Sequence, residues 1–114
     1  MRVVSYLGEP IDPAIVGSYF DLLIGRLFKI LPLRERNEPA LGLYIRGLQR
    51  ELSGLGDYIP SVKADASVLS IIAILQVYAE SPQSSLEDVR RDVFSAIGVC
   101  GKLRQQYIES GVDT

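Results

Sequence analysis

The sequence contains no histidine and no tryptophan, and Cys100 is its only cysteine. The missing histidines exclude a histidine general base, histidine metal ligands and the Ser-His or Cys-His pairs of nucleophilic catalysis. A single cysteine forms neither an internal disulfide nor a multi-thiolate metal site, and this use of cysteine suits a reducing cytoplasm. We therefore expect a cytoplasmic protein that is not an enzyme and that binds no cofactor or metal ion.

Carboxylates supply the remaining metal hypothesis. Glu87, Asp88 and Asp92 lie on neighbouring helical faces, and all-helical nucleotide hydrolases hold Mg²⁺ with carboxylates of this kind on two facing helices. Such a site needs a second acidic pair, but Glu35 and Glu38 bracket a predicted loop and helix start. We interpret Glu87, Asp88 and Asp92 as acids that are favoured at the start of a helix by its dipole.

Long hydrophobic runs and a strong excess of charge are also missing. The 12 Lys and Arg residues nearly balance 14 Asp and Glu residues, which is unlike a dedicated nucleic-acid binder. Residues 14–31 are interrupted by three charged side chains, and the apolar stretch 68–79 is shorter than the roughly 20 residues that span a membrane. The first residues lack an apolar signal-peptide region. With 114 residues, 47% of them hydrophobic, we expect one soluble domain, residues 1–114.

The first helix is predicted over residues 13–31. Asp12 is a good N-cap, Pro13 suits the first helical position, and Pro32 disfavours helical geometry in the residue before it. Gly17 and Gly25 each cost roughly 1 kcal/mol in a helix interior. We attribute this cost to close packing of another backbone, with approach of a ligand as the alternative. The helix is apolar except for one narrow stripe, formed by Ser18, Asp21, Gly25 and Lys29.

The second helix is predicted over residues 38–55. Asn37 is its expected N-cap, and Gly56 is expected to supply a left-handed C-terminal cap. Apolar residues at alternating spacings of four and three predict one buried seam. These residues are Leu41, Ile45, Leu48, Leu52 and Leu55.

The third and fourth helices are predicted over residues 62–80 and 85–110. The third begins near Ser61 or Asp65, and its apolar stretch 68–79 fits a buried strand as well, but we favour a helix because no comparable partner strand exists. Ser84 and Glu87 form a capping box, and Gly111 is a plausible stop. The fourth helix has an inward seam of Leu86, Val89, Val93, Ala96, Cys100, Leu103 and Tyr107.

The predicted fold is all-α, a four-helix bundle with antiparallel or orthogonal packing. A short extended N-terminal segment, residues 3–7, should lie across the bundle or pair with its copy in a second subunit. The fourth helix is longer than the first by roughly two turns. Its end near residues 105–110 should therefore project, pack on the N-terminal segment or meet another subunit.

The favoured functional hypothesis is a non-enzymatic interaction module. The first and third predicted helices are apolar nearly all round, which is more apolar surface than one small bundle needs. We expect the chain to form a homo-oligomer, to bind a larger protein as an accessory, inhibitory or regulatory subunit of bacterial or phage origin, or to do both. The predicted interaction residues are Tyr19, Phe20, Leu23, Leu27, Phe28, Leu103, Tyr107 and Ile108.

The alternative hypothesis is an anion-binding module for a nucleotide or nucleic acid. Guanidinium groups present paired donors to phosphate, and an aromatic ring can stack on a base. Interleaved acidic residues and the net acidic balance disfavour it. The candidate residues are Arg26, Lys29, Arg34, Arg36, Tyr44, Arg46 and Arg50.

Overall fold

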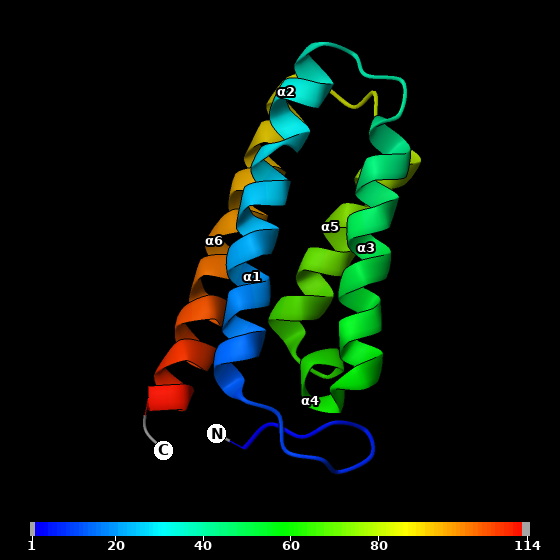
Figure 1. Ribbon diagram of the computed structural model, residues 1–114. Helices are drawn as coiled ribbons and strands as arrows, with labels where there is room; N and C mark the ends of the chain where they lie inside the picture. The colour runs from blue at the N-terminus through cyan, green and yellow to red at the C-terminus, as the bar shows by residue number, and fades with distance from the viewer. Residues whose placement is uncertain (1, 113–114) are drawn as a thin grey trace.

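The computed structural model describes residues 2–112, and the side chains of residues 2–109. Its helices are α1 (Pro13–Phe28), α2 (Ile30–Glu35), α3 (Leu41–Tyr58), α4 (Pro60–Lys63), α5 (Ala66–Glu80) and α6 (Leu86–Val112). Figure 1 shows the four long helices α1, α3, α5 and α6 side by side along a 45 Å axis, each reversing the direction of the one before. The all-α class is confirmed, and this arrangement is compatible with the expected four-helix bundle.

The start of α1 is confirmed, but its end differs from the prediction. Asp12 accepts a hydrogen bond from the backbone N–H of Ala14 at 3.0 Å, and Pro13 occupies the first turn. The helix breaks at Lys29 and resumes as α2. Pro32 falls in the first turn of α2, where a missing N–H costs little, so helical structure continues to Glu35 instead of ending at Leu31.

Both predicted caps of the second helix are wrong. Asn37 has a φ of 53° and follows α2, while α3 begins at Leu41 after Ala40, which makes no side-chain cap. Gly56 lies within α3, which ends at Tyr58 before the extended residue Ile59. The seam itself is confirmed, because Leu41, Ile45, Leu48 and Leu52 are buried and Leu55 is half-buried.

The third predicted segment is helical as expected, but it forms two separate helices. Pro60–Lys63 form the single turn α4, and Asp65 then caps α5 by accepting a hydrogen bond from the backbone N–H of Ser67 at 2.8 Å.

The capping box before α6 is wrong by one residue. Ser85 Oγ accepts from the N–H of Asp88 at 3.2 Å, whereas Ser84 Oγ donates to the carbonyl of Ser81. The helix also includes Gly111, the expected stop, and continues to Val112.

The N-terminal segment is extended and folds back on itself. Val4 forms an isolated antiparallel bridge with Pro10, and this is the β pairing found within residues 2–112. The N–H of Tyr6 donates to the carbonyl of Tyr58 at 2.8 Å, so the segment lies across the end of the bundle near α4 (Figure 1). Of the two expectations, the structure therefore has the segment crossing the bundle.

Packing between α1 and α6 explains the length of α6. Phe20 stacks on Tyr107 with ring centroids 6.0 Å apart, and a Cβ on Gly17 would lie 2.8 Å from Ile108 Cγ1. Because α2 continues the line of α1 and also packs on α6, α1 and α2 together cover α6. Close packing is thus the role of Gly17, while Gly25 is exposed and a Cβ there would meet nothing within 4 Å.

Candidate functional site

Five of the eight predicted interaction residues lie in the interior of the chain. Phe20, Leu23 and Leu27 of α1 and Leu103 and Tyr107 of α6 are all buried between the helices. Because these side chains already pack inside one chain, they offer no surface to a partner in this structure. This corrects the sequence-based interaction surface: the apolar faces of the first and fourth helices cover each other.

The other three predicted interaction residues do not form one patch. Phe28 makes an edge-to-face contact with Phe94, with centroids 5.9 Å apart, whereas Ile108 lies against Gly17 at the opposite end of α1. Tyr19 is half-buried, and within the described residues its hydroxyl has no hydrogen-bond partner. Burial raises the pKa of Tyr19 to about 12.

The first group of predicted anion-binding residues lies between α1 and α3. Arg26 donates from Nη1 to both carboxylate oxygens of Glu51, at 2.8 and 2.6 Å. Tyr44 donates its hydroxyl to the carbonyl of Arg26 at 2.7 Å. An open hollow of about 450 Å³ is lined by Arg26, Tyr44 and Glu51, and Lys29 lines it as well. Glu51 therefore offsets the charge of Arg26 and leaves one net positive charge among these side chains.

The second group lies on the side of α3 toward α5. Arg46 and Arg50 line a separate open hollow of about 410 Å³ together with Asp57. Arg46 also lies 3.8 Å from a carboxylate oxygen of Glu80, which is on α5. The two basic groups are thus on different sides of α3, each next to acidic side chains.

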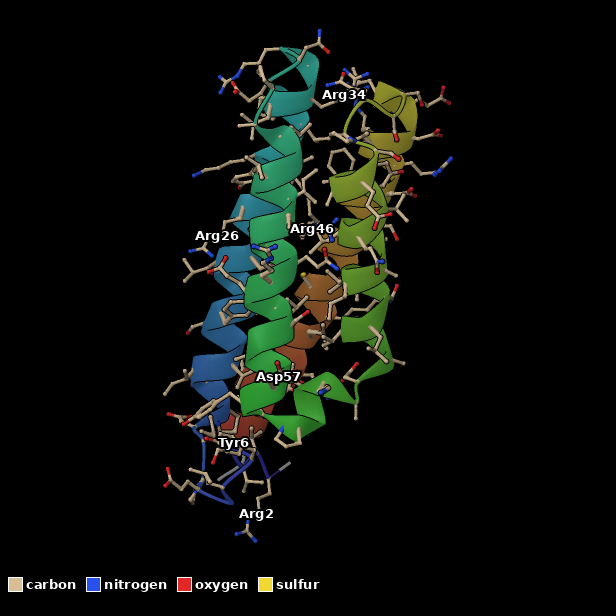
Figure 2. The ribbon with its side chains drawn as sticks, turned by 90° about the vertical axis from the view of Figure 1, so that its right-hand side faces the viewer. Arg2, Tyr6, Arg26, Arg34, Arg46 and Asp57 are labelled. Carbon is tan, nitrogen blue, oxygen red and sulfur yellow. The ribbon has the colours of Figure 1, made fainter. Side chains whose placement is uncertain are left out.

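The last two predicted cations are at the opposite end of the bundle from Asp57. Arg34 donates to the carbonyl of Ser84 at 2.9 Å, and Arg36 lies 3.8 Å from Glu38. In Figure 2, Arg26, Arg34 and Arg46 lie well apart. The structure does not bring the seven predicted anion-binding residues together.

Acidic and thiol groups offer little reactive chemistry. Asp92 accepts hydrogen bonds from Arg91 and from the hydroxyl of Tyr78, and these bonds lower the pKa of its carboxyl. Burial raises the pKa of the Cys100 thiol to about 12. Across residues 2–112, no three acidic or cysteine side chains come together in a way that would hold a metal ion. The helices of this part of the chain are also too short or too polar to cross a membrane.

The sequence-based site missed the outward side of α5. Leu69 and Val77 are 52% and 54% exposed, and Ala73 is exposed midway between them. We call these three residues the α5 face. They are one helical turn apart, and no charged residue occurs between Asp65 and Glu80. The signal for this site is the uncharged stretch 66–79: the third predicted helix contributes to the surplus apolar surface that favours association, but none of its residues is among the predicted interaction residues.

A groove between α3 and α5 borders the α5 face. Its volume is about 210 Å³. Leu52, Ser53, Gly56, Val68, Leu69 and Ile72 form its small and apolar lining, and Asp57 and Lys63 are also at its wall.

No protein-family model matches the chain, and searches of curated proteins and of solved structures also gave no match. Evidence on the function therefore comes from the chain's own surface.

Proposed function

We propose that this protein is a non-enzymatic interaction module that associates with another protein surface through the α5 face. The observation that carries the proposal is the exposure of Leu69, Ala73 and Val77 on a helix with no charge over residues 66–79. A helix at the surface of a monomer normally presents charged or strongly polar side chains to water. Over residues 66–79 the outward side of α5 exposes Ser67, Ser70 and Gln76 but no charged side chain, so the α5 face suits contact with a second apolar surface.

The free energy gained by burying the exposed side chains of the α5 face supports a contact of moderate strength. Full burial of an aliphatic side chain contributes about 1.5–3 kcal/mol, so covering the exposed halves of Leu69 and Val77 contributes about 1 kcal/mol each. Further contacts must come from the neighbouring α3 surface. The partner is accordingly a protein with an apolar patch and a polar rim, either a second copy or a larger protein that this chain accompanies or regulates.

The first test compares association of the wild type with a double variant. Leu69→Glu with Val77→Glu places two charges on the α5 face, so sedimentation velocity should lose any dependence on protein concentration. Leu22→Glu is the matched control, because Leu22 is 62% exposed on α1 beside the charged residue Asp21. Equal effects of the control and the double variant would contradict the proposal.

The second test identifies the partner. A photo-reactive amino acid at position 69 or 77 should give one discrete adduct in the cells that naturally make the protein, and the same probe at position 22 should give none. The mass of the adduct separates a second copy from a larger protein. If positions 69 and 77 give no adduct and the purified protein stays monomeric at high concentration, the proposal is wrong.

A further inference from the structure

Two opposite charges lie on the side of α3 that borders the α5 face. Arg50 and Asp57 are both exposed and both line the open hollow on α3. They are seven positions apart in the sequence, which is two helical turns or about 10 Å. Within the described residues, Arg50 has no ion pair or side-chain hydrogen bond, and Asp57 meets Lys63 through one carboxylate oxygen at 3.1 Å. In this part of the chain Arg50 is therefore an unpaired cation, and Asp57 keeps one carboxylate oxygen free while Lys63 offsets part of its charge.

The residues midway between these two charges are small, and they lie level with Leu69 along the axis of the bundle. Ser53 and Gly54 lie midway between Arg50 and Asp57, and a Cβ on Gly54 would meet nothing within 4 Å. Ser53 and Leu69 line the same groove between α3 and α5. In Figure 2, which labels Arg46 and Asp57, both α3 and α5 face the viewer. Arg50, Ser53, Gly54, Asp57 and Leu69 thus form one surface, which we call the α3–α5 surface.

This surface is complementary to itself in one orientation. If two copies meet with their α3 helices antiparallel and a two-fold axis beside Ser53 and Gly54, then Arg50 of each copy is level with Asp57 of the other. Leu69 of each copy then lies near the axis, where it is covered by the other copy. In a parallel pairing, residues of equal height meet, so the two charges stay about 10 Å apart along the axis and neither ion pair forms.

We propose that the occupant of the α3–α5 surface is a second copy of this chain, in this antiparallel two-fold arrangement. The proposal rests on the proposed function and names its partner. Apolar contact of Leu69 and close approach at Ser53 and Gly54 supply the affinity. The two Arg50 to Asp57 ion pairs fix orientation and register, because exposed ion pairs contribute more to specificity than to affinity.

Charge reversal tests the register directly. Arg50→Asp puts two acids on each copy, and Asp57→Arg puts two bases on each copy, so each variant alone repels itself at both ion-pair positions. Each should dimerise about tenfold more weakly than the wild type at low salt. An equimolar mixture of the two variants should form a heterodimer, because opposite charges face each other again. The double variant Arg50→Asp with Asp57→Arg should for the same reason dimerise more tightly than either single variant, although the new arginine at position 57 then lies beside Lys63 and the wild-type affinity is not fully restored.

Sedimentation equilibrium measures the affinities, and native mass spectrometry counts the heterodimer in the mixture. Arg36→Asp is the control, because it reverses an exposed arginine near the start of α3, away from the surface. Circular dichroism establishes that each variant is folded, and the exposure of both side chains favours this.

The outcomes separate this inference from the proposed function. Recovery in both the mixture and the double variant supports the antiparallel second copy. Mixtures that bind no better than the single variants would overturn the register, and a wild type that stays monomeric would overturn the second copy as occupant. In that last case, an adduct of a larger protein at position 69 would leave the proposed function standing, whereas no adduct would remove both.

Discussion

Two glycines of α3 should respond in opposite ways to the same substitution. A Cβ on Gly56 would lie 3.0 Å from Lys63 Cα, 3.1 Å from Lys63 Cβ and 3.3 Å from Lys63 N. A Cβ on Gly47 would meet nothing within 4 Å outside its own helix. The difference arises because the short helix α4 turns back against the end of α3 at Gly56, whereas Gly47 faces solvent.

The magnitude follows from two opposing effects. Alanine is favoured over glycine inside a helix by about 1 kcal/mol, so Gly47→Ala should stabilise the fold by about 0.5–1 kcal/mol. At Gly56 the same gain is opposed by overpacking of about 1–3 kcal/mol, because backbone atoms of α4 must shift. The helix term largely cancels when the variants are compared. Gly56→Ala should therefore be less stable than Gly47→Ala by about 1–3 kcal/mol.

Urea unfolding followed by far-ultraviolet circular dichroism measures this difference. Both variants should keep the wild-type slope, so that the midpoints report stability alone. Dilute protein keeps any association out of the comparison. Equal stabilisation by the two substitutions would refute the reasoning, since it would mean that α4 does not press on Gly56.

Two further predictions concern ionisation. Hydrogen bonds from Arg91 and Tyr78 lower the pKa of Asp92 below its ordinary 3.8, so the stability that Asp92 contributes is present above that pH and is lost as pH falls through the lower folded-state value. Asp92→Asn should flatten the acid side of the stability profile, and an unchanged profile would contradict this. Because burial raises the pKa of Cys100 to about 12, a thiol reagent at neutral pH should label it only as fast as the protein unfolds; rapid labelling of the native protein would contradict the burial.

Burial along two of the helices could be predicted well from the sequence. The seams of the second and fourth predicted helices, such as Ile45 and Leu52 on α3 or Val93 and Cys100 on α6, are buried in the structure. Such a seam follows from helical geometry alone, because spacings of three and four return side chains to one side. The identity of the neighbouring helix is not needed for this prediction.

Helix ends are harder to predict from the sequence than burial, because the same residue type occurs in different backbone geometries. Asp12 was recognised correctly, since a carboxylate followed by proline strongly favours an N-cap. Asn37 fits both an N-cap and a left-handed residue after a helix, and the structure has the second. Gly56 suggested a left-handed cap, but tertiary contact with Lys63 explains it instead. Contact between distant segments cannot be read from a short window of sequence.

The position of the proposed association surface depends on which helix lacks a charged side. Both α1 and α5 are rich in apolar residues, but the interaction residues predicted from the sequence lie on the first of them and on the end of the fourth predicted helix, with none on α5. The polar stripe of α1, which includes Ser18, Asp21 and Lys29, is exposed, and the apolar residues Ile15 and Leu22 are exposed as well, next to charged side chains of the same helix. Helix α5 has no charged residue between its ends, and packing against α3 and α6 leaves its third side in water. That third side exposes Leu69, Ala73 and Val77 beside uncharged polar residues, so the absence of charge on α5 is the reason for placing the proposed association surface there and not on α1.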